Sequence, residues 1–394
     1  MSPLDPLAAR YDVVVVGARA AGAATAMLLA RQGLRVLAVD RGRYGADTLS
    51  THALMRGGVL QLHRWGLLDR VRASGAPTVS RTTFHYGEDT FPVEIRPADG
   101  IDGLYAPRRS VLDSILVDAA VAAGARVVHC VRMTRLLRGF HGRVQGVELE
   151  ADDGSTKRVR ATWVIGADGV RSRVAREAGA RTERIAHASS GVVYGYSSGL
   201  DLDGYHWHYA PGVSAGVIPT NGGSACIFAS MPSHRFLGEV RWDLAAGYDR
   251  VLEEVSPALA AAVRSGRKLE SLRGFPGEPG HLRQAWGPGW ALVGDAGYFK
   301  DPITAHGLTD ALRDAELLAC AIGAGTESAL FEYQQRRDEL SVDLFEGTER
   351  IARYDWTLEQ VQELHRSLSD AMKGEVRALR ALDCATRPAE RRSA

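Results

Sequence analysis

The sequence predicts an α/β protein in which a Rossmann-type nucleotide-binding domain carries an inserted, mostly antiparallel β-sheet domain and a C-terminal helical region. Residues 12–40 carry the first observation, because two apolar runs flank an Ala- and Leu-rich segment and together form a βαβ unit. Residues 187–230 combine Gly, Tyr, Ser and Val in short alternations that are typical of an antiparallel sheet. Nearly all residues after position 307 have helical periodicity.

Local patterns define the elements in order. The apolar, β-branched run at 12–17 predicts a buried parallel strand, and 20–32 predicts a helix that Gly33 stops. RVLAVD at 35–40 predicts the second strand. Further along, the same criteria predict helices at about 52–65, 67–73 and 109–123, a hairpin at 80–95, buried strands at 162–169 and 289–294, and helices at 307–323, 331–355 and 357–382.

The order of these elements divides the chain into three regions. The nucleotide-binding domain is expected to be discontinuous and to comprise 10–80, 105–180 and 285–325, and the inserted substrate domain to comprise 81–104 and 181–284. Residues 326–394 form the C-terminal helical region. Its mixed charges suit either a cap packed on the nucleotide-binding domain or a dimer surface, and we favour the cap.

Composition excludes several classes of protein. The 394 residues include 48 basic and 47 acidic side chains, so a net charge of +1 provides no field for nucleic acid or an anionic membrane. No apolar run is long enough to span a bilayer, and the first residues do not resemble a signal peptide. Four widely spaced cysteines form no CxxC pair, and no HExxH spacing occurs. We therefore expect a cytoplasmic protein without a metal site.

A glycine-containing turn joins the first strand to the first helix. Its sequence is Gly17-Ala18-Arg19-Ala20-Ala21-Gly22, which keeps the outer glycines of the dinucleotide fingerprint and replaces the middle one by Arg19. The first glycine permits the tight turn, and the last permits close packing of helix on strand. Asp40 ends the second strand, where a carboxylate can accept hydrogen bonds from ribose hydroxyls. The unit therefore predicts a nucleotide-binding site.

Three motifs in this order resemble those of FAD-dependent oxidoreductases of the para-hydroxybenzoate hydroxylase type. That superfamily includes aromatic hydroxylases, flavin-dependent halogenases and geranylgeranyl reductases. The first motif is the unit from Gly17 to Asp40. The other two are Gly166-Ala-Asp168-Gly-Val-Arg-Ser-Arg173 and Gly294-Asp295-Ala-Gly297, the latter followed by Asp301-Pro302 and Gly307-Leu308. The resemblance covers about residues 10–325 and implies that the Rossmann-type domain binds FAD.

The resemblance also implies how individual residues contact FAD. Asp295 would accept a hydrogen bond from a ribityl hydroxyl, and Gly294 would let the backbone approach the cofactor. Pro302 would lie beside the isoalloxazine ring. The amides of Gly307 and Leu308 would face the N1–C2=O edge, where a helix N-terminus stabilises the anionic reduced flavin.

Four further residues match family positions near the cofactor. Asp168 would organise the pyrophosphate side and the nicotinamide nucleotide. Arg109, in the segment PRRSVLD, would contact FAD. Arg41 and Met133 would contact the adenine.

The function implied by the resemblance is that of an FAD-dependent monooxygenase. It would use NADH or NADPH and O2 to oxygenate a small, mostly apolar or aromatic substrate through a flavin C4a-hydroperoxide, and a separate flavin reductase is a possible partner. One alternative is a C=C reductase of the geranylgeranyl reductase type, although Asp47–His52 lacks the Cys-Gly segment of those enzymes. A second alternative is a non-catalytic flavin-binding protein, which the substitution at Arg19 allows. Halogenation is disfavoured because His85 stands where halogenases have a lysine.

Several histidines and tyrosines are candidates for the substrate pocket. His306 and His52 are the expected catalytic groups, because histidine exchanges protons near neutral pH and His306 lies beside the predicted flavin site. His85, Tyr194 and Tyr209 are expected to line the substrate pocket. In the segment 206–209 the two histidines alternate with Trp and Tyr, so the strand places one pair on each face.

Overall fold

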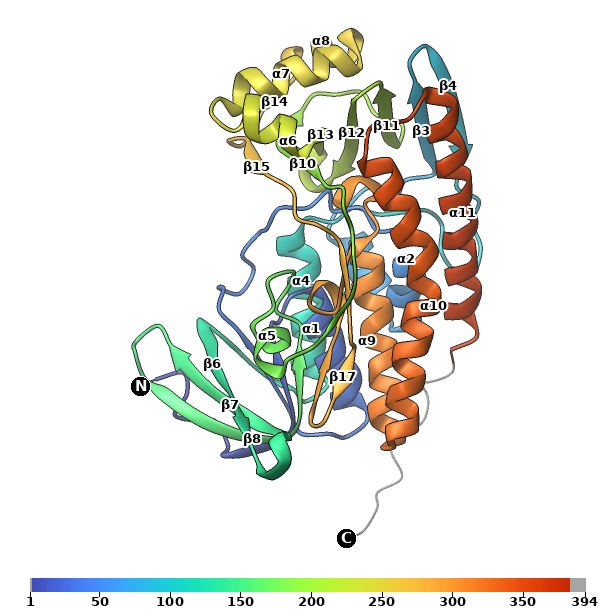
Figure 1. Cartoon of the computed structure of the whole chain (residues 1–394). Helices are drawn as coiled ribbons and strands as arrows, with labels where there is room; N and C mark the ends of the chain where they lie inside the picture. The colour runs from blue at the N-terminus through green and yellow to red at the C-terminus, as the bar shows by residue number, and fades with distance from the viewer. Residues whose placement is uncertain (1, 383–394) are drawn as a thin grey trace.

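The computed structural model of the protein describes residues 2–382. Its first sheet has the strand order β17-β18-β8-β1-β2-β5, and β1 pairs in parallel with β2 and β8. Strands β6 and β7 extend this sheet from β8 as an antiparallel ribbon (Figure 1). The strands are β1 (Arg10–Val16), β2 (Val36–Asp40), β5 (Arg126–His129), β6 (Val131–Arg138), β7 (Val144–Ala151), β8 (Thr156–Gly166), β17 (Trp286–Gly287) and β18 (Trp290–Leu292).

Helices cover one face of this sheet and the antiparallel ribbon covers the other. The helices are α1 (Ala20–Arg31), α4 (Arg109–Ala122) and α9 (Gly307–Ala324). Because successive side chains of a strand point to opposite faces, Val13 and Val15 of β1 pack with the helices, whereas Val14 and Val16 pack with the ribbon. Burial on both faces explains why β1 is a continuous apolar run.

A second sheet lies above the first and has the order β14-β10-β13-β12-β11-β3-β4, with β15 paired to β10 (Figure 1). Its pairs are antiparallel except for β3 with β11, which run parallel. Helices α7 (Leu244–Val255) and α8 (Pro257–Ser265) belong to the core on its outer face. The strands are β3 (Arg81–Tyr86), β4 (Asp89–Glu94), β10 (Ser190–Ser198), β11 (Tyr205–Ala210), β12 (Val213–Thr220), β13 (Ser224–Pro232), β14 (Arg267–Lys268) and β15 (Arg273–Phe275).

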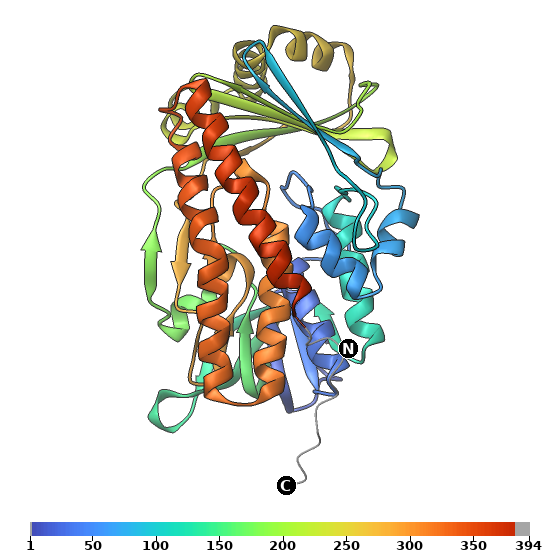
Figure 2. The same ribbon diagram turned by 90° about the vertical axis from the view of Figure 1, so that its right-hand side faces the viewer.

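Two long C-terminal helices connect the two sheets. Helix α10 (Glu327–Ala352) lies beside α9, and α11 (Leu358–Arg380) runs from the second sheet down to α2 (Arg56–Arg64) (Figure 2). They therefore form the expected cap, although residues 383–394 of that region lie outside the described range. The remaining elements are α3 (Leu68–Ala73), α5 (Arg173–Ala178), α6 (Ser233–Arg235) and a small sheet of β9 (Thr182–Ile185), β16 (His281–Arg283) and β19 (Tyr298–Phe299).

One expected helix begins later than its sequence pattern indicates. The pattern predicts a helix from about residue 52, but α2 begins at Arg56. His52 has a φ of +65°, which no right-handed helix accommodates, and Leu54 forms an antiparallel bridge with Tyr105. Tertiary contacts thus hold residues 52–55 out of the helix. Within residues 2–382, no helix combines the length and the apolar character needed to cross a membrane.

Candidate cofactor and substrate site

The glycine turn between β1 and α1 is fixed by close backbone contacts. Gly17 has a φ of +100°, and a Cβ there would lie 2.3 Å from the carbonyl oxygen of Ala167. A Cβ at Gly22 would lie 1.8 Å from the carbonyl oxygen of Gly17. No side chain caps α1, so the first amides of this helix, including that of Ala21, face the turn and can bind an anion.

Asp40 closes the turn at the end of β2. One carboxylate oxygen accepts a hydrogen bond from the amide of Ala18 at 2.7 Å, and the other accepts one from the amide of Gly42 at 2.7 Å. A small pocket next to it is lined by Ala18, Arg19, Asp40, Arg43 and His129, among others. Asp40 is thus placed to accept hydrogen bonds from a bound ribose while holding the loop around it.

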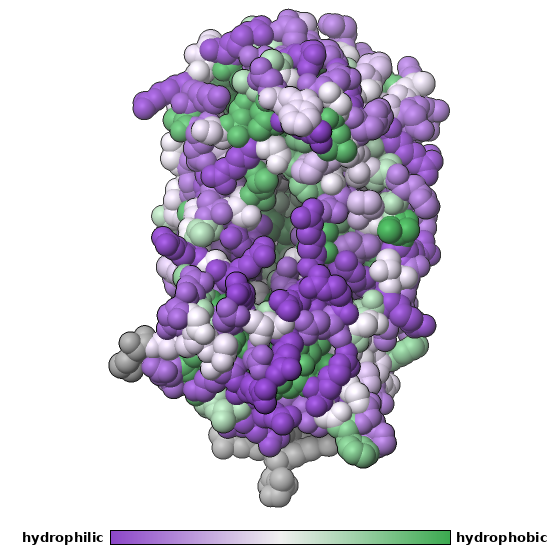
Figure 3. Space-filling model, turned by 60° about the vertical axis from the view of Figure 1, so that its left-hand side comes forward, coloured by the Kyte–Doolittle hydropathy of each residue, from purple (hydrophilic) through white to green (hydrophobic). Residues whose placement is uncertain are grey.

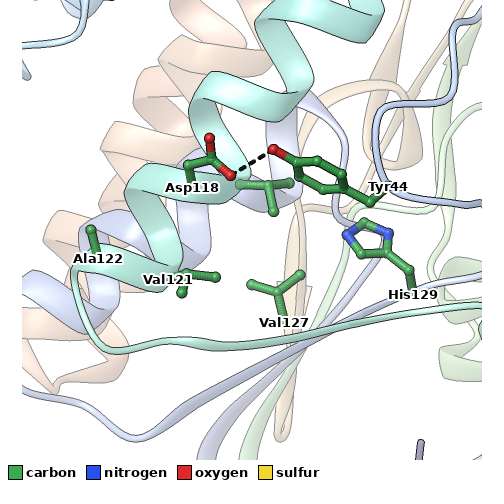
Figure 4. Close-up of a pocket in the computed structure, with 7 residues that line it drawn as sticks. Tyr44, Asp118, Val121, Ala122, Val127 and His129 are labelled. Carbon is green, nitrogen blue, oxygen red and sulfur yellow. Dashed lines mark hydrogen bonds between the residues drawn. The ribbon is translucent and has the colours of Figure 1, made fainter.

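A second cavity of about 360 Å³ adjoins this pocket at the ends of β2 and β5 (Figure 4). Tyr44 donates a hydrogen bond to Asp118 at 2.7 Å on one side, and Val127 lies below (Figure 4). His129 lines both cavities, and its two ring nitrogens are buried without a hydrogen-bond partner. Because buried polar atoms are normally paired, this imidazole is arranged to meet a ligand.

The structure corrects one of the two expected adenine contacts. Met133 is 4% exposed and packs in the core between the first sheet and the β6–β7 ribbon, so its side chain cannot reach a nucleotide. Arg41 is exposed, and its contact with the adenine stays a prediction. Arg43, two residues further on, lines the pocket. The β2–β5 pairing places His129 directly beside Asp40, which the sequence did not reveal.

Two arginines converge on one buried carboxylate. Arg109 binds Asp113 through Nε at 3.0 Å and Nη2 at 3.1 Å, one turn along α4. Arg19 approaches the same carboxylate at 3.6 Å, and its Nη1 is buried without a hydrogen-bond partner. Sequence analysis missed Asp113, although its i,i+4 spacing from Arg109 was a readable signal. The two arginines, Arg19 and Arg109, present positive charge beside the free amides of α1.

The segment from Gly294 to Leu308 forms the other wall of the site. Asp295 and Gly307 are exposed while most of their neighbours are buried, and Pro302 is half-buried. The enclosing protein raises the pKa of Asp295 to about 6, despite the favourable charge of Arg109. A Cβ at Gly307 would meet only open space, and no side chain caps α9. The uncapped amides of Gly307 and Leu308 are therefore available to a ligand.

Asp301 joins this segment to the second sheet. Its carboxylate accepts hydrogen bonds from the amide and hydroxyl of Ser190, at 2.6 Å and 2.5 Å, and from the amide of Ile303 at 3.0 Å. Burial raises the pKa of Asp301 to about 6, although these hydrogen bonds oppose the rise. Asp301 therefore fixes the start of β10 relative to Pro302.

His306 takes part in a buried charge network. It is 1% exposed, and its Nε2 lies 2.7 Å from a carboxylate oxygen of Glu375 on α11. Glu375 also accepts a hydrogen bond from Arg313 at 3.0 Å, and Asp310 bonds both Arg313 and Lys300. The two bound cations make this acidic group unsuited to a metal ion. His306 is thus a buried structural partner of α11, and only its unpaired Nδ1 remains to face a ligand.

His52 lies between the cofactor half and the second sheet. Its Nδ1 accepts a hydrogen bond from the amide of Arg109 at 3.2 Å, and its Nε2 lies 2.5 Å from the hydroxyl of Tyr196. Burial lowers the pKa of His52 to about 3, so the ring is neutral and its Nε2–H donates to Tyr196. The guanidinium of Arg108 covers the Tyr196 ring at 3.9 Å and pairs with Asp47.

The inner face of the second sheet is lined with aromatic side chains. Tyr194 and Tyr196 of β10 and Phe228 of β13 share this face with Trp207 of β11, all within one apolar cluster that includes Ile303. Figure 3 shows the molecular surface hollowed between the upper and lower halves, with hydrophobic residues in the hollow. The aromatic rings of this face thus lie next to Ile303 of the Gly294–Leu308 segment.

Two residues that were expected to line the substrate pocket have other positions. His85 lies on the outer face of the second sheet, opposite the aromatic face, because it alternates with Phe84 and Tyr86; the prediction that it lines the pocket is wrong. Tyr209 is on the inner face but packs against Trp356 and His365 of the C-terminal region, in the core.

Asp168 has mainly a capping role. Its carboxylate accepts hydrogen bonds from Ser172 and from the amides of Arg173 and Val174, so it organises the start of α5 next to the glycine turn. Burial raises the pKa of Asp168, although these hydrogen bonds act in the opposite direction.

Taken together, the glycine turn, the carboxylate of Asp40, two uncapped helix N-termini and the unpaired polar atoms of Arg19 and His129 fit a dinucleotide that spans from β5 to α9. These features define an FAD-binding α/β flavoprotein with a second, sheet-based layer over the flavin end. Residues 10–348 match the family described as FAD binding domain, and the chain belongs to this family. FAD is accordingly its cofactor, and the protein is an FAD-dependent oxidoreductase.

The known proteins that this chain resembles in sequence or in fold are named for different reactions. Digeranylgeranylglycerophospholipid reductase 1 of Methanopyrus kandleri is 32% identical over 371 residues, which cover 87% of this chain and 90% of the relative. A triple mutant of the flavin-dependent brominase Bmp2 superposes with a TM-score of 0.81 at 18% identity, covering 95% of this chain and 96% of the other. PqsL of Pseudomonas aeruginosa, a probable FAD-dependent monooxygenase, superposes with a TM-score of 0.74 at 20% identity, covering 92% and 100%. The two structural likenesses establish the fold.

Proposed function

We propose that the protein is an FAD-dependent monooxygenase that acts on a small apolar or aromatic substrate. In the balanced reaction, the substrate, O2, NAD(P)H and a proton give the oxygenated substrate, water and NAD(P)+. Bound FAD, held by the Gly17–Gly22 turn and the Gly294–Leu308 segment, would supply the hydride-accepting and oxygen-transferring chemistry.

The aromatic inner face of the second sheet carries this proposal, because its rings form one apolar cluster with Ile303 of the Gly294–Leu308 segment. Burial lowers the pKa of His52 to about 3 and raises that of Cys226 to about 12. Burial also raises the pKa of Tyr194 and Tyr196. These side chains are therefore neutral near pH 7, and none is a strong acid. Oxygen transfer from the cofactor to an electron-rich ring needs a dry, apolar pocket and no strong acid from the protein.

The chain's own residues have three tasks in this proposal. The aromatic side chains bind the substrate and exclude water from the hollow. The amides of Gly307 and Leu308 stabilise negative charge on the reduced cofactor. The neutral His52 holds the hydroxyl of Tyr196 in place through a 2.5 Å hydrogen bond, so this hydroxyl can orient a polar group of the substrate.

The test is rapid mixing of the anaerobically reduced holoenzyme with oxygenated buffer, in the presence and absence of aromatic compounds. We expect a transient visible spectrum that differs from both oxidised and reduced flavin. In turnover under 18O2, one labelled atom should enter the product. Direct reoxidation with every compound tested, without label in any product, would overturn the proposal.

A second candidate is a C=C reductase, which the 32% identity over 90% of the Methanopyrus kandleri reductase favours. Reduction of an isolated double bond requires a proton as well as a hydride. Asp295 and Asp301, whose pKa values are raised to about 6, are the groups of the site that could supply this proton. An experiment without oxygen distinguishes the two candidate functions. If a prenylated lipid reoxidises the reduced protein under strict anaerobiosis and its double bonds become saturated, the protein is a reductase.

A further inference from the structure

The outer face of the second sheet carries a histidine cluster far from the cofactor half. His85 comes from β3, and His206 and His208 come from β11, which pairs with β3 in parallel. In this register His208 lies directly beside His85, and His206 lies one step before them on the same face. One ring nitrogen of each histidine lies within 4.8 Å of the corresponding nitrogens of the other two.

From this geometry we propose that His85, His206 and His208 bind a borderline divalent transition-metal ion, Zn²⁺ being the reference case. Neutral imidazoles are preferred ligands of such ions, and three protein ligands plus one water complete a tetrahedral site. The side chain of His206 is 20% exposed, so water has access to the fourth position.

Two of the ligand atoms are already spaced for chelation. His85 Nε2 and His206 Nδ1 lie 3.1 Å apart. A tetrahedral ion with metal–nitrogen bonds of about 2.0–2.1 Å requires nitrogens about 3.3 Å apart. His208 stacks on His85 with ring centroids 4.1 Å apart, so rotation of its side chain brings the third nitrogen into range.

The surrounding residues hold the rings in ligating orientations. Asp203 accepts a hydrogen bond from His206 Nε2 at 2.9 Å, which leaves the lone pair on Nδ1. The hydroxyl oxygen of Thr90 lies 3.1 Å from His85 Nδ1 and can accept a hydrogen bond from its N–H, which leaves the lone pair on Nε2. A carboxylate or hydroxyl behind a ligating imidazole is the usual outer-shell arrangement of metal sites. Arg81 bonds the other oxygen of Asp203 and keeps that carboxylate in place.

Charge also suits a cation. The carboxylate of Asp203 provides negative charge, and a bound ion would join the β3–β4 hairpin to β11. The site therefore has a structural role that is independent of the proposed flavin chemistry.

The experiment is calorimetric titration of the tag-free, FAD-loaded full-length protein with Zn²⁺ alone, and parallel titration with Co²⁺ followed by visible absorbance. We expect one equivalent of Zn²⁺ to bind and Co²⁺ to give the intense visible bands of a tetrahedral site. His208→Ala and His206→Gln should each weaken binding at least about tenfold, and Asp203→Asn should weaken it about 10- to 100-fold.

His187→Ala is the matched control, because His187 is exposed and outside the cluster. It should leave Zn²⁺ affinity unchanged, and urea unfolding of each variant shows whether it is folded. The proposal is overturned if no stoichiometric binding occurs, if octahedral Co²⁺ spectra appear, or if folded His206→Gln protein binds Zn²⁺ as tightly as the wild type. Equal loss in His187→Ala would also overturn it, since binding would then not depend on this cluster.

Discussion

Replacement of Glu375 by alanine tests whether the C-terminal helix α11 stabilises the cofactor half of the molecule. Glu375 is 1% exposed, and its carboxylate is bonded to His306 and Arg313. Burial by itself would raise the pKa of Glu375, but the opposing effects of His306, Arg313 and Lys300 lower it to about 2. The variant removes this anion and leaves the Nε2 of His306 unpaired.

Two independent estimates give the loss of folding free energy expected for Glu375→Ala. A fall of the Glu375 pKa from 4.5 to about 2 corresponds to about 3 kcal/mol of folding free energy. Removing one partner of a buried ion pair costs about 3–5 kcal/mol. Because Arg313 keeps its bonds to Asp310, Asp314 and Ser341, we expect a loss of about 3 kcal/mol, at the low end of that range.

The stability difference between the wild type and Glu375→Ala should depend on pH. The folded pKa is depressed, so the stabilisation is fully present above pH 4.5 and is lost as the pH falls towards 2. The assay is urea unfolding of wild type and Glu375→Ala at several pH values from neutral downwards. The difference between their unfolding free energies should be constant near neutral pH and should shrink below pH 4.5.

Glu363→Ala is the control, because Glu363 is exposed on the same helix. It should change the unfolding free energy by less than about 0.5 kcal/mol. We also expect Glu375→Ala to bind FAD more weakly, since His306 directly precedes Gly307 at the start of α9. A stability loss below about 1 kcal/mol near neutral pH would refute the account of the network.

Three further predictions, made on five variants, test the site. Gly307→Ala should leave the unfolding free energy of the FAD-free protein unchanged or slightly raised, because its Cβ meets only open space there. The same Cβ should weaken FAD binding, because it occupies space beside the uncapped amides of α9. Gly22→Ala should destabilise the protein itself, since its Cβ would lie 1.8 Å from a carbonyl oxygen. Equal effects of the two on stability, measured by urea unfolding, would contradict this distinction. Asp295→Ala should weaken FAD binding about 10- to 100-fold in a fluorescence titration, as expected for a lost charged hydrogen bond, and unchanged affinity would refute its role. Tyr196→Phe should preserve FAD affinity but lower the efficiency with which NAD(P)H oxidation is coupled to substrate oxygenation. His52→Ala should lower this coupling efficiency similarly, because it removes the hydrogen bond that holds the Tyr196 hydroxyl. An unchanged coupling ratio would exclude this positioning role.

Much of the cofactor half follows from local sequence. The βαβ unit, the glycine turn and Asp40 are close in sequence, and each is dictated by the conformations that short segments can adopt. The long helices α9, α10 and α11 follow from periodicity, and the pleat of β11 correctly separates the histidines from Trp207 and Tyr209. The expectation of a helix from residue 52 was wrong because contacts with a distant segment hold His52 and Leu54 in other conformations.

The candidate site was predictable only in part. The residues expected to meet FAD at the turn and in the Gly294–Leu308 segment come together, whereas the roles of His306 and His85 depend on partners 69 and 121 residues away. Asp113, Asp301 and Glu375 also became apparent only from their contacts. A single carboxylate in a sequence has no feature that shows whether it will be solvated or buried.

The sequence by itself determined the class of this protein, because a turn that needs glycine and a strand buried on both faces leave patterns in consecutive residues. Only the tertiary structure decided which face of the second sheet meets the cofactor half. The same holds for the ring of His306, which is bound to α11, and for the three histidines that meet on the outer face. The physical reason is that burial and electrostatic pairing depend on distances in space. Those distances are set by how whole sheets and helices pack, and no local pattern specifies them.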